Sequence, residues 1–136
     1  MKKFLLVGLI VFFAKMASTQ EILELINSGK IIDQGQKKHD AKEYKEAIEL
    51  YKKINRSDTN YDRALHELAY SYYADSNFTE SKKYAELGLK LFPNKSNQWY
   101  LILANDEDEL GNTQKALDYY DKIIAVNPNS YLNWFN

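Results

Sequence analysis

Residues 65–93, LHELAYSYYADSNFTESKKYAELGLKLFP, decide the fold of this chain. Apolar or small side chains recur at spacings of three and four on both sides of a polar break at residues 75–77, which predicts two amphipathic helices in a hairpin. Asn77, with Glu80 three residues later, has the spacing of a helix cap, and Pro93 closes the second helix. The two stripes are Leu65, Leu68, Ala69, Tyr72 and Tyr73, then Ser81, Tyr84, Ala85, Gly88, Leu89 and Leu91. Neither helix can bury its stripe alone, so the hairpin needs neighbours.

The same order of residue types occurs before and after this hairpin. Small residues of the second helices fall at Ala47, Ser81 and Ala116, at steps of 81 − 47 = 34 and 116 − 81 = 35. The first helices align in the same way, with small residues at Gly35, Ala69 and Ala104 and large ones four positions earlier at Ile31, Leu65 and Tyr100. This spacing resembles the tetratricopeptide repeat (TPR) family, in which each repeat of about 34 residues is a helix–turn–helix.

Individual positions show how far the resemblance extends. The family pattern is matched in the central repeat by Leu68-Ala69, Tyr72, Phe78, Ala85 and Pro93, and in the third by Leu103-Ala104, Ala116, Tyr120 and Pro128. The departures are Gln34, Lys38 and Thr59 in the first repeat, Ser81 in the second, and Glu107 and Thr113 in the third. The resemblance implies an all-α fold, an α-solenoid of about three repeats plus the start of a fourth. Their expected bounds are about 28–61, 62–95, 97–130 and 131–136.

Residues 1–19 have the layout of a secretory signal peptide. Lys2 and Lys3 precede an apolar run over residues 4–14, which is too short to span a bilayer because that takes about 20 residues. We predict cleavage before Gln20, so that residues 20–136 form the repeat domain, the membrane is met only through the transient segment, and the product is exported to a periplasm or the exterior. An uncleaved amphipathic anchor is the alternative. Removing residues 1–19 takes away three lysines and no acids, so the formal charge falls from −1 to −4.

The two flanks of the repeats leave alternatives open. The apolar residues of 22–26 either extend the first helix backwards or are separated from it by a kink at Ser28-Gly29. Residues 131–136 read as the opening of a fourth repeat, with Trp134 in the place of Tyr100 and Leu65. These six residues either fold back on the third hairpin or begin the continuation of a longer repeat protein. In the second case the isolated chain is expected to self-associate through Trp134 and Phe135.

The resemblance also implies a binding surface. In this family the first helices line a concave face, and the side chains between their packing positions point into it. Carried onto this chain, the central repeat contributes Arg63, His66, Tyr70 and Tyr73, and the third Gln98, Leu101, Asn105 and Asp108. The first repeat adds Ile32, Gln36 and His39. Tyrosines, a leucine and amides suit an extended peptide or a partner helix. The alternative for Tyr70 and Tyr73 is packing between repeats.

Composition and motifs argue against several other classes of function. The chain has no cysteine, which excludes disulfides, thiolate zinc sites and cysteine nucleophiles. A formal charge of −1 with dispersed lysines argues against nucleic-acid binding. His39 and His66 indicate two surface imidazoles rather than a metal site. The acidic run at residues 106–109 lacks the alternating ligands and glycine of a calcium loop, and predicts a solvated helix face.

No nucleophile–base pair, phosphate-binding loop or cofactor fingerprint appears, so we expect no catalysis, no cofactor and no metal. The sequence therefore predicts an exported TPR scaffold or adaptor that binds a protein or peptide on its concave surface. The alternative is a structural or assembly arm, or the N-terminal part of a larger envelope-associated repeat protein.

Overall fold

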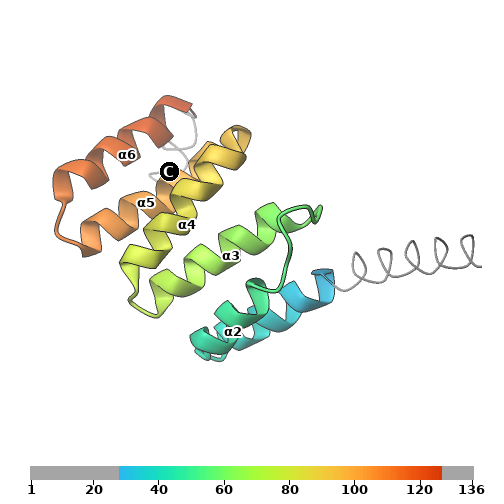
Figure 1. Cartoon of the computed structure of the whole chain (residues 1–136). Helices are drawn as coiled ribbons and strands as arrows, with labels where there is room; N and C mark the ends of the chain where they lie inside the picture. Colours follow the sequence, from blue (N-terminus) through green and yellow to red (C-terminus); the bar gives the residue numbers. More distant parts are fainter. Residues whose placement is uncertain (1–27, 127–136) are drawn as a thin grey trace, which may run out of the picture.

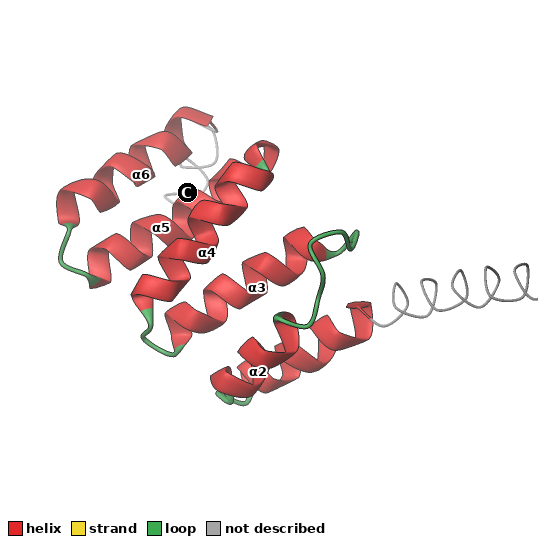
Figure 2. Cartoon of the chain, in the orientation of Figure 1, coloured by secondary structure: helices red, strands yellow, loops and turns green. Residues whose placement is uncertain are grey.

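The computed structural model describes residues 28–126 as a row of helical hairpins without strands (Figure 2). Residues 28–40 are helical, and α2 (Tyr44–Tyr51), α3 (Tyr61–Ala74) and α4 (Phe78–Leu91) follow. A short 3-10 turn, η1 (Pro93–Lys95), leads into α5 (Ser96–Glu109) and α6 (Thr113–Val126). Successive helices lie side by side in chain order (Figure 1). The predicted all-α repeat solenoid is confirmed. The predicted signal peptide and the residues Pro128, Trp134 and Phe135 lie outside the described part.

The central hairpin forms where the sequence predicts it. The chain leaves the helix after Ala74 and re-enters it at Phe78, and the Asn77 side chain accepts a hydrogen bond from the Glu80 backbone N–H (3.3 Å). This side-chain acceptor satisfies one of the N–H groups that have no partner inside the helix. The Glu80 carboxylate does not return to Asn77 and pairs with Lys83 instead (2.9 Å). The cap is therefore one-sided rather than reciprocal.

The core runs along the faces that the periodicity indicates. Leu65, Leu68 and Ala69 of α3 are buried against Ala85 of α4 and the flanking hairpins. Tyr72 is also buried, and its ring stacks on that of Tyr84 at 5.4 Å between centroids. Each fully buried aliphatic side chain of this kind contributes about 1.5–3 kcal/mol to folding through the area it removes from water. The hairpins are therefore held together by shared apolar faces, as a repeat architecture requires.

Trp99 is the largest side chain in this core, although its burial was not predicted from the sequence. It is fully buried, and its indole lies so close to Gly88 of α4 that a Cβ at that position would sit 2.5 Å from Trp99 Cε3. The large residue predicted for this place, Tyr100, is only partly buried and lies against Tyr119 of α6 (5.9 Å). When the two hairpins are aligned with the step of 35 residues, Trp99 occupies the position that Ala64 holds in the central repeat. The alignment of the first helices therefore did not indicate the role of Trp99 in the core.

The position of the first hairpin at one end of the described stack explains why its sequence departs from the family pattern. Gln34 is exposed, and Lys38 forms an ion pair with Glu43, because no described helix covers this end of the stack. Terminal repeats of solenoids need such polar outer residues. α2 ends at Tyr51, and Ile54 is buried although it lies beyond the end of the helix. The connection from α4 to α5 spans residues 92–95, because α5 already begins at Ser96.

Candidate functional site: the first-helix face

Hydrogen bonds between the first helices of successive hairpins join them into one surface. Gln36 of residues 28–40 donates from Nε2 to Glu67 of α3 (2.8 Å), and Arg63 donates from Nη2 to Gln36 Oε1 (2.9 Å). On the other side, the Tyr73 hydroxyl donates to Glu109 of α5 (3.5 Å). We call the solvent-accessible side chains of this surface the first-helix face. Its members among the predicted site residues are Gln36, His39, Arg63, His66, Tyr70, Tyr73, Gln98, Leu101, Asn105 and Asp108.

Tyr70 and Tyr73, two of the four tyrosines of α3, lie on this face rather than in the core. The Tyr70 side chain is 45% exposed, and its ring stacks on Tyr73 with centroids 6.4 Å apart and planes 11° from parallel. Burial and the neighbouring Glu109 carboxylate raise the pKa of Tyr73, so its hydroxyl remains protonated and able to donate at neutral pH. The stripe predicted for α3 therefore ends at Tyr72, and Tyr73 is partly exposed.

The predicted residues of the third repeat differ from one another in their roles. Leu101 is 49% exposed and Asp108 is exposed, so both are free to meet a partner. The Asn105 amide oxygen accepts a hydrogen bond from the Tyr120 hydroxyl (2.9 Å), which ties α5 to α6. Asn105 therefore has a structural bond in addition to its accessible surface.

Two expectations about the first repeat and the histidines are wrong. Ile32 is fully buried in the core and does not reach the surface. His39 is not a free surface imidazole, because its ring stacks on Tyr70 (4.9 Å) and its Nδ1 lies 2.9 Å from the hydroxyl of the buried Ser71. His66 meets Trp99 edge-on at 5.6 Å, and burial lowers the pKa of its imidazole. Both rings are packed between repeats, which periodicity within one helix cannot reveal.

The acidic run is also not the solvated face that was expected. Asp106 and Glu107 are buried, and only the second half of the run is exposed. Burial acts to raise the pKa of Glu107, but hydrogen bonds from Lys82 (2.5 Å) and Asn112 (2.7 Å) outweigh it and hold that pKa below its usual value. The buried carboxylate is thus paired, as a buried charge must be. Asn112, which precedes α6, is the residue that donates its side-chain N–H to this carboxylate.

The burial of Asp106 is compensated less completely than that of Glu107. Neither carboxylate oxygen has a hydrogen-bond partner within the described part of the chain. Burial raises its pKa to about 7, a nearby Ser81 hydroxyl and Lys82 lower it in part, and Glu107 raises it further. A buried carboxyl with this pKa binds a proton near neutrality rather than carrying a fixed charge.

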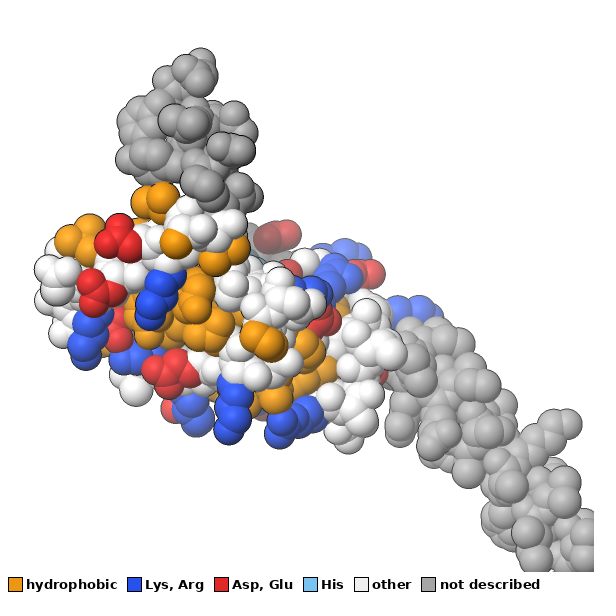
Figure 3. Space-filling view, turned by 90° about the horizontal axis from the view of Figure 1, so that it is seen from above, with side chains coloured by type: hydrophobic (Ala, Val, Ile, Leu, Met, Phe, Trp, Pro, Cys, Tyr) orange, Lys and Arg blue, Asp and Glu red, His pale blue; other side chains and the backbone are white. Residues whose placement is uncertain are grey.

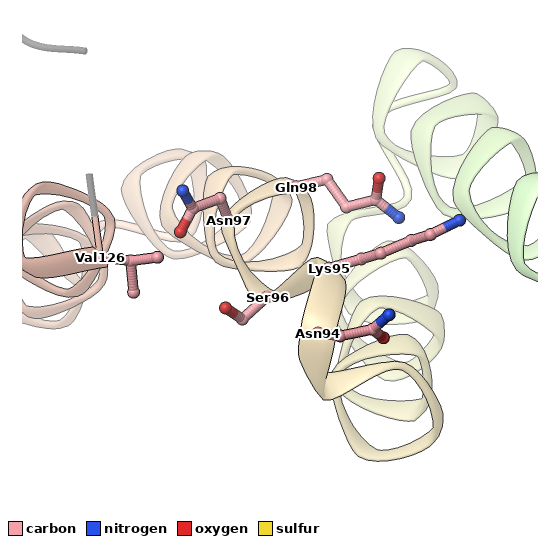
Figure 4. A pocket seen from close by; sticks show the side chains of 6 residues that line it. All are labelled: Asn94, Lys95, Ser96, Asn97, Gln98 and Val126. Carbon is pink, nitrogen blue, oxygen red and sulfur yellow. The ribbon is translucent and has the colours of Figure 1, made fainter. Parts of the chain in front are cut away.

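A pocket at the N-terminal end of α5 is polar and open. Its lining is Asn94, Lys95, Ser96, Asn97, Gln98 and Val126 (Figure 4). Ser96 and Asn97 point towards the space beside Val126, whereas Lys95 points away towards α3, where it pairs with Asp62. Gln98 is the predicted site residue that borders this pocket. On the face seen in Figure 3, basic and acidic side chains are interspersed among apolar ones, and no large patch of one sign appears on it.

Residues 28–126 contain no cluster of three or more histidine, cysteine, aspartate or glutamate side chains placed to hold a metal ion. Within the same residues, every helix is too short or too polar to cross a membrane.

A comparison with curated proteins found no significant match. A family model described as a tetratricopeptide repeat matches residues 100–130, which cover most of α5 and all of α6. Together with the stacked hairpins, this match identifies the fold as a helical repeat of the tetratricopeptide type.

Proposed function

We propose that the protein is an exported scaffold that holds an extended segment of a partner protein on its first-helix face. The observation that carries the proposal is the continuity of this face. Gln36, Arg63 and Glu67 link the first two hairpins, and Tyr73 with Glu109 links the next two. Exposed Tyr70 and Leu101 then stand on neighbouring helices of one rigid surface. Tyrosine offers a large contact area at low entropic cost, which suits it to peptide binding.

A random peptide library displayed on phage tests this proposal without knowledge of the natural partner. We expect the unchanged protein to enrich a defined set of peptides, because its face is preformed. Tyr70→Ala or Leu101→Ala should weaken binding of those peptides by about tenfold or more, which corresponds to about 1.4 kcal/mol. Lys90→Ala, at an exposed position of α4, is the matched control. Equal losses in all three variants, or binding that none of them changes, would contradict the proposed site.

Export is the second part of the proposal and rests on residues 1–19. Their basic start, apolar run and small polar end are those of a cleavable signal. Intact-mass measurement of the protein recovered outside the cytoplasm of its host should give a chain that begins at Gln20. A chain that retains Met1 in that compartment would instead favour the uncleaved anchor.

An assembly arm is the second candidate function. It is favoured by α6, which buries Ala116 but leaves Leu117 (50%) and Ile124 (38%) exposed on the last described helix. We expect the chain to associate with itself as its concentration rises, through this face together with Trp134 and Phe135. Sedimentation velocity should show larger species that Leu117→Ser or Trp134→Ser abolishes, whereas Lys90→Ala leaves them unchanged. A chain that stays monomeric at high concentration would exclude this function.

A further inference from the structure

A continuous row of aromatic rings crosses the first-helix face near the turns of the first two hairpins. Tyr44 meets His39 at 5.2 Å, His39 stacks on Tyr70 at 4.9 Å, Tyr70 stacks on Tyr73, and Tyr73 meets Phe78 at 5.6 Å. These five rings, which we call the aromatic row, come from four different helices. Their mutual contacts hold them in place, so a ligand that lies on them has little ordering cost to overcome.

Two of the three helices that carry this surface, α3 and α5, are rich in carboxylates and poor in cations, whereas residues 28–40 hold three lysines and two aspartates. α5 has no lysine or arginine, and α3 has one basic residue, Arg63, which already binds Asp33 and Gln36. Two of the six carboxylates on α3 and α5 pair with lysines of other elements, Asp62 with Lys95 and Glu107 with Lys82. The four that remain without a lysine partner in an ion pair of the described residues are Glu67, Asp106, Asp108 and Glu109.

A hydrogen bond places negative charge at the end of the aromatic row. The Tyr73 hydroxyl donates to the accessible Glu109 carboxylate (3.5 Å), and burial together with this carboxylate raises the pKa of Tyr73. Asp106 adds less charge, because it is buried and its pKa of about 7 lets it bind a proton near neutrality. A cation above Tyr73 would be attracted by the ring face and by the Glu109 carboxylate.

We propose that the first-helix face binds an extended peptide segment whose arginine or lysine side chains lie over Tyr70 and Tyr73 and direct their charge towards Glu67, Asp108 and Glu109. This inference rests on the proposed function and names the chemistry of the bound segment. A cation is attracted to the face of an exposed tyrosine ring, and carboxylates around the ring strengthen that attraction. An acidic segment or a phosphate backbone would instead meet like charge, so this face discriminates by repulsion as well as by attraction.

Three short peptides of the same length distinguish the proposal from its alternatives. They alternate serine with arginine, with citrulline, which keeps the shape of arginine without its charge, or with glutamate. Fluorescence anisotropy with the full chain should show binding of the arginine peptide, at least about tenfold weaker binding of the citrulline peptide, and none of the glutamate peptide. Raising the salt concentration should weaken the binding of the arginine peptide, because salt screens the attraction between charges.

Two double variants with the same change in net charge provide the site test. The variant with Asp108→Asn and Glu109→Gln should bind the arginine peptide about tenfold more weakly, and so should Tyr70→Ala. The variant with Asp118→Asn and Asp121→Asn, both on α6, should bind it as the unchanged protein does. Equal losses in the two double variants would show a response to net charge alone and overturn the inference, as would absence of arginine-peptide binding. If phage-selected peptides bind through Tyr70 but carry no cationic preference, the proposed function stands and this inference fails. Circular dichroism of each variant confirms that it is folded.

Discussion

Asp106→Asn should make the protein more stable at pH 8, with a gain that shrinks towards zero as the pH falls to about 4. The carboxyl group is fully buried without a hydrogen-bond partner in the described residues, and its folded-state pKa of about 7 lies above the ordinary value of 3.8. Below about pH 4 the Asp106 carboxyl group is protonated in both the folded and the unfolded chain, so the folded state then pays no cost for burying a charge. That advantage is lost as the pH rises from about 4 to 7, because the unfolded chain then releases a proton that the folded chain retains.

The size of the effect follows from the difference in pKa. A shift of one unit corresponds to about 1.4 kcal/mol, so a difference of about three units gives an upper bound of about 4 kcal/mol at pH 8. The groups that face Asp106 are Ser81 and Lys82 of α4, Tyr73 of α3 and Glu107 of its own helix. Glu107 has the opposite sign, since its lowered pKa contributes stability that is lost as the pH falls through the acid range. The difference between variant and unchanged protein isolates the Asp106 contribution.

Urea unfolding at a series of pH values measures this directly. Asp108→Asn is the matched control, because Asp108 lies two residues away and is exposed. It should change the free energy of unfolding by no more than about 0.5 kcal/mol at any pH. A constant difference between the Asp106→Asn variant and the unchanged protein across the pH range would contradict the buried, proton-binding state of this residue.

Gly88→Ala should destabilise the protein by about 2 kcal/mol or more, although alanine is the better helix former. The new Cβ would lie 2.5 Å from Trp99 Cε3, a distance that real Cβ atoms do not adopt, so the indole or α4 must shift. Trp99 is fully buried, and overpacking a filled core costs about 1–3 kcal/mol and occasionally more. This cost exceeds the helix-propensity gain of about 0.5–1 kcal/mol.

Gly29→Ala provides the internal control for the same chemical change. Gly29 is also helical, but among residues 28–126 no atom outside its own turn of helix lies within 4 Å of the position its Cβ would take. The propensity gain is then unopposed, and the variant should be more stable by about 0.5–1 kcal/mol. Thermal and urea unfolding of both variants should therefore shift in opposite directions. A neutral or stabilising Gly88→Ala would mean that Trp99 does not fill the space against α4.

Much of the fold could be predicted from local pattern alone. A stripe such as Leu65, Leu68 and Ala69 identifies the face of a helix that must be buried, and the turn residues around Asn77 and Gly111 end one helix and begin the next. Gly111 adopts a positive φ of 78°, which glycine tolerates without strain. The register of 34 and 35 residues then indicates that the hairpins are of like design and stack on one another. These features depend on contacts within a turn or two of the same helix, so the sequence carries them directly.

The site was predicted less completely, since its residues lie where helices meet. Tyr70, Leu101 and Asp108 are accessible as expected, but Ile32 is buried. The His39 ring stacks on Tyr70 and lies within hydrogen-bond distance of the Ser71 hydroxyl. The burial of Trp99 was not predicted, and the equivalent position in the central repeat holds the small Ala64. A large residue fits there only because Gly88, on the preceding helix, leaves room for it.

The sequence by itself determined the all-helical hairpins, their order and the side of each helix that turns inwards, because a 3.6-residue period is readable within one segment. The tertiary structure decided which side chains of a mixed or polar stretch are enclosed. Residues 106–109 are four consecutive acids, yet only the packing of neighbouring helices determines that Glu107 meets Lys82, that Asp106 has no hydrogen-bond partner among residues 28–126, and that Asp108 and Glu109 are exposed. Burial of a charge depends on what packs over it, and that is a property of helices brought together from different parts of the chain.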